Sequence, residues 1–235
     1  MLYHFDPVYM LLLIGVMIVG FLVQLRLKSV FGNYSKVPLS SGMSGKEVAE
    51  KMLRDNGIFD VKVQSVEGSL TDHYHPHEKT VNLSHDVYYG KSVSAAAVAA
   101  HECGHAVQHA TSYRWLEMRS KLVPVVNMAS TFMNIVFLAM AFLAFSYHLY
   151  NQALIVIIIA QAAITFFTLI TLPVEIDASR RALQWLEGAG LTYGEEHEKA
   201  KTALNWAAGT YMVAALAAMV QLMYFIFQFM NRRDE

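Results

Sequence analysis

The chain has 235 residues, of which 55% are hydrophobic and 16% are charged, and its mean hydropathy is +0.33. This composition is typical of a membrane protein and argues against a fold surrounded only by water. The net charge is −1 and the Lys and Arg residues are scattered, which excludes the basic surface that nucleic-acid binding needs. A single cysteine, Cys103, excludes an intrachain disulfide and a cysteine-based metal cage.

Four apolar runs predict four transmembrane helices, because at about 1.5 Å per residue each is long enough to approach the roughly 30 Å hydrocarbon thickness of a bilayer. Basic residues follow the first run instead of preceding it, so we interpret it as an uncleaved anchor and not as a signal peptide. The second and third runs are joined by a short charge-free connection at 146–152, which suits a tight membrane hairpin. The four runs cover residues 8–25, 122–147, 153–172 and 207–230.

The residues between the first two runs are polar and rich in turn signals, as expected of a folded soluble insertion. The predicted fold class is therefore mainly α: a four-helix integral membrane protein with a small α+β soluble insertion. Lys and Arg gather in 26–121 and 180–201, so the positive-inside rule predicts that both segments face the cytoplasm. The predicted segments are a first transmembrane helix (1–28), the insertion (29–121), a transmembrane hairpin (122–172), a juxtamembrane helical segment (173–206) and a fourth transmembrane helix with its tail (207–235).

Inside the insertion, hydrophobic spacing predicts a short amphipathic helix over 44–56 that ends at Gly57. Two valine-rich or alternating stretches, 61–66 and 79–83, predict short strands that form a hairpin or an edge pair. The polar stretch 71–77 between them contains three histidines and Pro76, and we interpret it as a solvated turn. An alanine-rich helix is predicted over 95–110, capped by Ser94 or Ser92.

This last helix carries His101-Glu102-Cys103-Gly104-His105. Residues four apart share one face of a helix, so both imidazoles can reach one zinc ion at roughly 2.0 to 2.1 Å, with Glu102 beside it as a general base. The alternative is two core histidines on an alanine-rich helix, but burying two imidazoles beside a carboxylate without a metal is costly. Gly104 weakens the helix, which predicts that another element approaches it closely beside the metal.

A catalytic zinc needs a third protein ligand. His109 continues the row, but it lies too far along the helix for the same ion. His73 and His77 could face one side of an extended segment. Glu175 is the best candidate: two membrane crossings separate it from the motif, so it returns to the same side of the membrane. Its alternative role is that of a helix-start acid after Pro173.

Several stretches resemble the YugP-like membrane zinc metallopeptidases of bacteria, and more distantly the gluzincin proteases of the HtpX and CAAX prenyl protease type. They are Asp72-His73-Tyr74, 81–84, 99–108, 173–175 and 178–183, so the resemblance spans nearly the whole chain. It implies a zincin-like insertion in a bacterial cell membrane, one Zn²⁺ per chain, and Glu175 as the third ligand. It also implies that Asn82, Leu83 and Ser84 form an edge strand that pairs with substrate.

One departure concerns the surroundings of the metal. The distant relatives have an aspartate four residues after the ligand glutamate, and this chain has Ser179 there. Asp177 is a weaker ligand candidate, and pairing with Arg180 or Arg181 explains it as well. The residues expected around the metal, without binding it, are His73, His109, Asp177 and Ser179.

The function expected from these features is that of a membrane-bound zinc metalloendopeptidase, with its active site facing the cytoplasm. Its partners would be the lipid bilayer and a protein or peptide substrate that is membrane-associated or unfolded. The alternative from another class is a metal-binding but inactive membrane scaffold, which the presence of Glu102 disfavours. Intramembrane cleavage is disfavoured because the motif helix ends among charged residues, and metal transport because the apolar runs lack ionisable residues. Nothing in the sequence indicates an oligomeric state.

Overall fold

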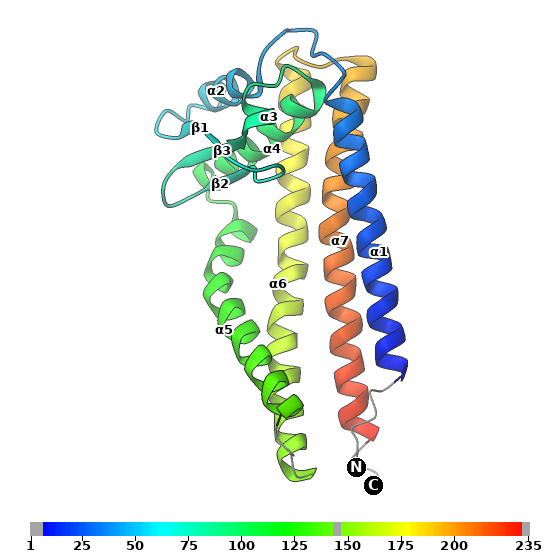
Figure 1. The fold of residues 1–235 in the computed structure, drawn as a ribbon. Coiled ribbons are helices and arrows are strands. Elements are labelled where there is room, and N and C mark those ends of the chain that lie inside the picture. Colours follow the sequence, from blue (N-terminus) through cyan, green and yellow to red (C-terminus); the bar gives the residue numbers. More distant parts are fainter. Residues whose placement is uncertain (1–6, 143–146, 232–235) are drawn as a thin grey trace. The chain divides into compact units, whose positions relative to one another are not determined.

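The computed structural model describes residues 7–142 and 147–231 (Figure 1). The described chain is mainly helical, and four of its helices are long and apolar enough to cross a membrane. The prediction of a mainly α protein is thus confirmed, and the four predicted membrane helices are present as helices capable of spanning a bilayer, while residues 232–235 of the expected tail lie outside the described part. The four helices are α1 (Pro7–Tyr34), α5 (Arg114–Phe142), α6 (Tyr147–Gly188) and α7 (Gly194–Asn231).

Two helix boundaries differ from the sequence prediction. The structure has α6 beginning at Tyr147, so most of the expected connection at 146–152 is helical; this stretch contains no Gly or Pro to stop a helix. Pro173 lies inside α6 instead of starting a helix. Glu175 is therefore in mid-helix, and the alternative role of a helix-start acid is wrong.

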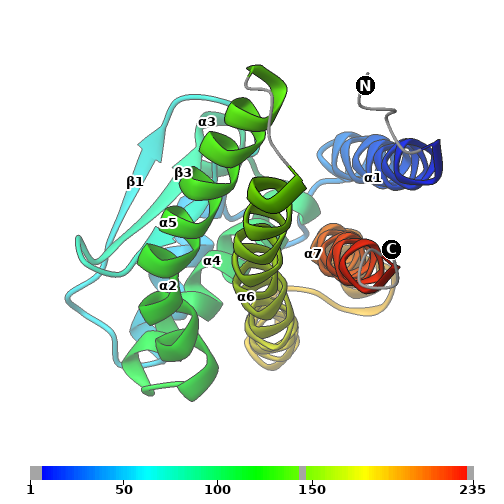
Figure 2. The same cartoon turned by 90° about the horizontal axis from the view of Figure 1, so that it is seen from below.

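The chain forms two compact units, which are described separately. The first comprises residues 1–21, 118–172 and 211–235 and contains apolar segments of all four long helices. Within it, α7 lies beside both α6 and α1 (Figure 2). Tyr9 stacks on Tyr224 with ring centroids 4.5 Å apart, and the side chains of Gln161 and Thr165 both donate to the Ala218 carbonyl at 3.1 Å. In a bilayer the lipid is as apolar as the helix surfaces, so hydrogen bonds of this kind help to hold neighbouring helices together.

The second unit comprises residues 22–117 and 173–210 and contains a three-stranded sheet. Its strand order is β1-β3-β2, with β1 parallel and β2 antiparallel to β3. Of the two predicted arrangements, the hairpin is wrong, because the two expected strands run parallel and a further strand, β2, lies in the stretch between them. The edge pair agrees with the structure, since β1 lies at an edge of the sheet and pairs with β3. The elements of this unit between α1 and α5 are α2 (Gly45–Asp55), β1 (Lys62–Val66), β2 (His73–His75), β3 (Thr80–Ser84), α3 (His85–Tyr88) and α4 (Val93–Ala110).

Local capping explains where α2 and α4 begin. Ser44 and Glu47 form a reciprocal capping box at the start of α2, which satisfies backbone N–H groups that have no partner within the helix. Gly57 follows α2 with a φ of +70°, a conformation that favours glycine. Of the two serines considered for α4, Ser92 is the cap, since its hydroxyl accepts from the backbone N–H of Ala95.

α4 is the central element of the second unit. Its alanines, together with Cys103, are buried in one core with β3, α2 and the 173–188 part of α6. Cys103 faces α2, where its sulfur lies 3.5 Å from the carbonyl oxygen of Ala49. Short side chains on α4 allow these neighbours to approach the helix axis closely.

Gly104 is a point of close approach between α4 and α6. A Cβ placed on Gly104 would lie 2.6 Å from the backbone oxygen of Ala178, a distance that real Cβ atoms do not show. The expectation that another element comes close to this glycine is confirmed. The close approach brings a turn of α6 against the motif helix.

We expect Gly104→Ala to lower the free energy of unfolding by about 1 to 3 kcal/mol, because the added methyl must push α6 away. Thermal unfolding in detergent would measure this loss. The control is Gly188→Ala: a Cβ there meets no atom within 4 Å, so this variant should be neutral or gain up to about 1 kcal/mol. Equal midpoints for Gly104→Ala and wild type would show that α6 does not press on this glycine.

Candidate metal centre

Three side chains from two helices converge at one point of the second unit. His101 and His105 come from α4, and Glu175 comes from α6. The Glu175 Oε2 atom lies 3.3 Å from Nε2 of His101 and 3.4 Å from Nε2 of His105. Within the described residues this is the group of histidines and acids whose geometry could hold a metal ion, and all three side chains have little exposure to solvent.

The spacing of these atoms fits a tetrahedral zinc ion. Two ligand atoms placed about 2.05 Å from such an ion lie about 3.3 Å apart. The two printed separations between the carboxylate oxygen and the imidazole nitrogens match this edge length. Two imidazoles and one carboxylate are also the donor types that zinc takes at catalytic sites with an open fourth position.

The nitrogen atoms on the far side of the two imidazoles are held by different groups. His101 Nδ1 lies 3.1 Å from the Ser179 hydroxyl, and His105 Nδ1 lies 3.0 Å from the Gln108 side-chain oxygen. Gln108 in turn donates to Asp177 at 2.9 Å. Hydrogen bonds of this kind fix the orientation of metal-binding imidazoles in proteins.

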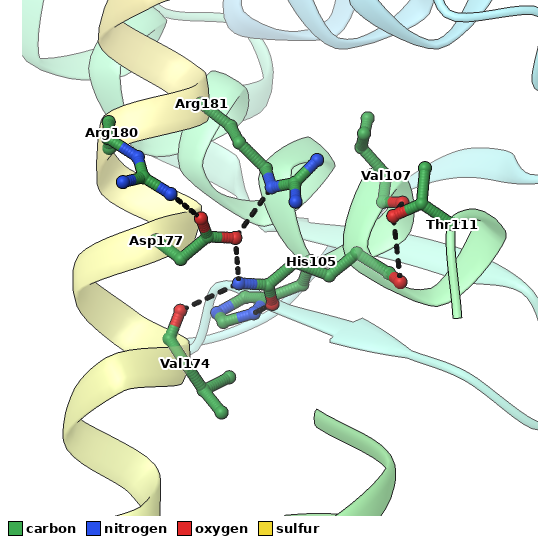
Figure 3. Close-up of polar contacts among 8 residues, drawn as sticks. His105, Val107, Thr111, Val174, Asp177, Arg180 and Arg181 are labelled. Carbon is green, nitrogen blue, oxygen red and sulfur yellow. Dashed lines mark hydrogen bonds and ion pairs between the residues drawn. The ribbon is translucent and has the colours of Figure 1, made fainter. Parts of the chain in front are cut away.

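Asp177 is buried and receives three side-chain donors, as Figure 3 shows for its arginine partners. Arg181 Nε donates at 2.6 Å, the Arg180 guanidinium donates to the other carboxylate oxygen, and Gln108 completes the set. Both arginines considered from the sequence therefore pair with Asp177. The aspartate does not reach the three converging ligand atoms itself.

Glu102 lies one residue from His101 and is buried. One of its oxygens accepts the backbone N–H of Tyr74 at 3.1 Å. Burial raises the pKa of Glu102 to about 7; His101 opposes this rise, and the carboxylates of Glu175 and Asp72 add to it. A carboxyl with such a pKa can both accept and return a proton near neutral pH.

Two histidines expected near the metal have other partners. His109 is exposed, and its Nδ1 lies 2.8 Å from the Tyr74 hydroxyl. His73 belongs to β2, so the interpretation of this stretch as a turn throughout is wrong. Its ring bridges the Thr71 carbonyl at 2.7 Å and the Asn82 amide at 3.2 Å. Neither imidazole belongs to the converging group.

The expectation that 82–84 belong to an edge strand is wrong for the strand as a whole, although β2 pairs only as far as Asn82, and substrate pairing by these residues stays a prediction. These residues lie in β3, the central strand, which pairs with β1 on one side and with β2 on the other. The Asn82 side chain accepts from Gln64 of β1 at 2.6 Å, and Ser84 donates its backbone N–H to Asp72 at 2.7 Å. The edge strand next to Glu102 is β2.

Sequence reasoning missed two residues at this site. Tyr74 contacts Glu102 through its backbone, so its residue type carries no signal of the contact. Gln108 did carry one: it lies three residues after His105, on the same helix face, in a helix predicted to be alanine-rich and buried on that side. A long amide in such a helix needs buried partners.

Zinc titration of the metal-free protein would test the converging group. We expect His105→Ala and Glu175→Gln to weaken zinc binding by much more than about 10-fold to 100-fold. That smaller loss is typical when a residue is removed that only hydrogen-bonds to a metal ligand. His109→Ala should bind zinc as the wild type does, because that imidazole contacts Tyr74 instead. Loss of zinc in His109→Ala, or its retention in Glu175→Gln, would contradict this ligand assignment.

Comparisons with known proteins agree with the chemistry of this donor set. A family model described as "Putative neutral zinc metallopeptidase" matches residues 9–230. The chain is 44% identical over 227 residues to a Bacillus subtilis (strain 168) protein named "Putative membrane protease YugP", covering 97% of this chain and 99% of that one. No solved structure matches the chain significantly.

Proposed function

Because the chain belongs to the neutral zinc metallopeptidase family that it matches over residues 9–230, we propose that it hydrolyses peptide bonds with one Zn²⁺ held by His101, His105 and Glu175. The observation that carries the proposal is the buried Glu102 carboxyl, with a pKa of about 7, adjacent to these three side chains. An inactive scaffold would not need a proton-transfer group there. The proposed substrates are membrane-associated or unfolded proteins, since four helices of this chain are apolar enough to span a bilayer.

In the proposed reaction Glu102 takes a proton from the attacking water and later gives it to the leaving amine. Zinc, when bound, lowers the pKa of water toward about 7 and polarises a carbonyl group. The Tyr74 N–H holds one oxygen of Glu102 at 3.1 Å, so the other oxygen remains for the proton transfer. Burial of Glu102 keeps its proton affinity high enough for both transfers.

The exposed side of β2 is the proposed place for an extended substrate. β2 lies at one end of the sheet, and its Tyr74 is the residue that contacts the general base. A peptide strand added along this edge would pass directly beside Glu102. This replaces the assignment of substrate pairing to β3, which is the central strand and whose residues 80–82 already pair with both neighbours.

The second unit also contains a cavity of about 360 Å³, and we propose that it receives a substrate side chain. It is bounded by the residues that precede β2 and by the turn of α4 that precedes His101. Asp72 and Val98 place it close to the site, since they lie two residues before Tyr74 and three before His101. Residues that line it include Lys28 and Gly32 of α1, Leu70 and Asp72, and Ala95 and Val98 of α4.

Detergent-purified wild type and Glu102→Gln should both bind one zinc per chain, but only the wild type should cleave an unfolded reporter protein. We expect the cleavage rate to fall by about 10² to 10⁴, the range that general-base removal causes. Zinc content by elemental analysis and cleavage by gel electrophoresis would be measured on the same samples. If zinc-loaded wild type cleaves no unfolded or membrane-bound substrate, the scaffold function is favoured.

Gly32→Phe tests the cavity. Gly32 lines the cavity, and a Cβ there meets no atom within 4 Å, so the first atom of a side chain fits without displacing the backbone. We expect a higher KM for the reporter, by about 10-fold or more as for a filled binding pocket, with unchanged zinc content. Gly188→Phe, at another open position, is the matched control. Unchanged KM in Gly32→Phe would show that substrate does not enter this cavity.

A further inference from the structure

We propose that Gln108 is a positioning residue that fixes both the orientation and the hydrogen-bearing nitrogen of His105. The inference rests on the metal site of the proposed function, but it concerns metal binding and not cleavage. Gln108 has no exposure to solvent. Its side chain is the group in contact with Nδ1 of His105, at 3.0 Å.

The hydrogen bonds of Gln108 leave its amide with one possible orientation. Its nitrogen lies 2.8 Å from the Val174 carbonyl oxygen and 2.9 Å from an Asp177 carboxylate oxygen. Both neighbours accept hydrogen bonds, so the two amide hydrogens are used there. An inverted amide would place its oxygen against two other oxygens in a buried site, which is strongly unfavourable.

This orientation determines the state of His105. The Gln108 oxygen can only accept, so Nδ1 of His105 must carry a hydrogen and donate it. In a neutral imidazole the other nitrogen, Nε2, then carries none. Nε2 is the atom 3.4 Å from the Glu175 carboxylate, where the metal would be held. In the neutral imidazole, Gln108 therefore leaves the lone pair on Nε2, the nitrogen that faces the candidate metal position.

Asp177 holds Gln108 in turn. Its carboxylate is fixed by Arg181 at 2.6 Å and by Arg180, and the Arg181 guanidinium also lies over the Tyr113 ring, 5.6 Å from its centroid. Figure 3 shows Asp177 between these arginines and the neighbourhood of His105. A carboxylate with two cationic partners has little freedom, so the Gln108 amide cannot rotate without losing a bond to a charged group.

The hydrogen bond of His101, the other candidate histidine ligand, does not determine which of its nitrogens carries the hydrogen. Ser179 lies 3.1 Å from Nδ1 of His101, and a hydroxyl can donate or accept by rotation. It is therefore compatible with either hydrogen position on His101. Of the two imidazoles, His105 is the one whose Nδ1 hydrogen is dictated by its hydrogen-bond partner.

Zinc affinity in Gln108→Met and Gln108→Glu separates positioning from a structural role. Met has a similar length but cannot accept the His105 hydrogen, so we expect zinc binding about 10-fold to 100-fold weaker. Glu retains the acceptor for His105 but places oxygens against Val174 and Asp177. We expect it to keep zinc affinity within about 3-fold of wild type while its metal-free melting temperature falls. Competition with a chromophoric chelator and thermal unfolding would measure the two quantities.

The control is Cys103→Ala, a buried change on the same helix that faces α2. It should lower the melting temperature and leave zinc affinity unchanged. Wild-type affinity in Gln108→Met, or equal losses in Gln108→Met and Gln108→Glu, would overturn the inference. If Gln108→Met does not fold, the zinc affinity of Gln108→Glu decides alone. Wild type that binds zinc but cleaves nothing would contradict only the peptidase proposal.

Discussion

The candidate metal centre depends on the close packing of α4 against α6 at Gly104. The glycine lies between the two histidines on the motif helix, and the Ala178 backbone fills the space that a side chain would occupy. Any larger residue there would separate the helices by the width of a methyl group or more. Since Glu175 lies one turn before Ala178 on α6, such a separation would remove the carboxylate from the imidazoles. The helix-weakening residue in the motif is thus the one that the third ligand requires.

Three buried carboxyl groups surround this contact, and each has different partners. Asp177 has two arginines and an amide, as expected of a group that stays ionised. Glu175 faces two imidazoles. Glu102 has one backbone N–H, and burial raises its pKa to about 7. The cost of burial, which His101 offsets only in part, therefore raises the pKa of the one carboxyl for which a high proton affinity is useful.

The surroundings of the two histidines also explain the departure from the gluzincin pattern. Where the distant relatives have an aspartate four residues after the ligand glutamate, Ser179 supplies a hydroxyl to His101. The nearby carboxylate of this chain, Asp177, reaches His105 through Gln108 instead. A carboxylate thus lies near the imidazoles, one amide away from His105. The zincin-like character of the insertion remains an expectation from resemblance, and what the structure provides is a mixed three-stranded sheet beside the motif helix.

The sequence by itself determined the features that depend on residues close together in the chain. Apolar runs of sufficient length defined the four membrane helices, and the four-residue spacing of His101 and His105 placed both imidazoles on one helix face. Counting the expected crossings also predicted that Glu175 lies near the motif, which agrees with its 3.3 and 3.4 Å distances from the two imidazoles. Tertiary structure alone decided the contacts between distant segments that have no periodic pattern: the insertion of β2 at the sheet edge, the central position of β3, and the Tyr74 N–H on Glu102. Strand order and backbone hydrogen bonds depend on which segments of the chain pack together. The residue types of one strand do not determine which strand pairs with it.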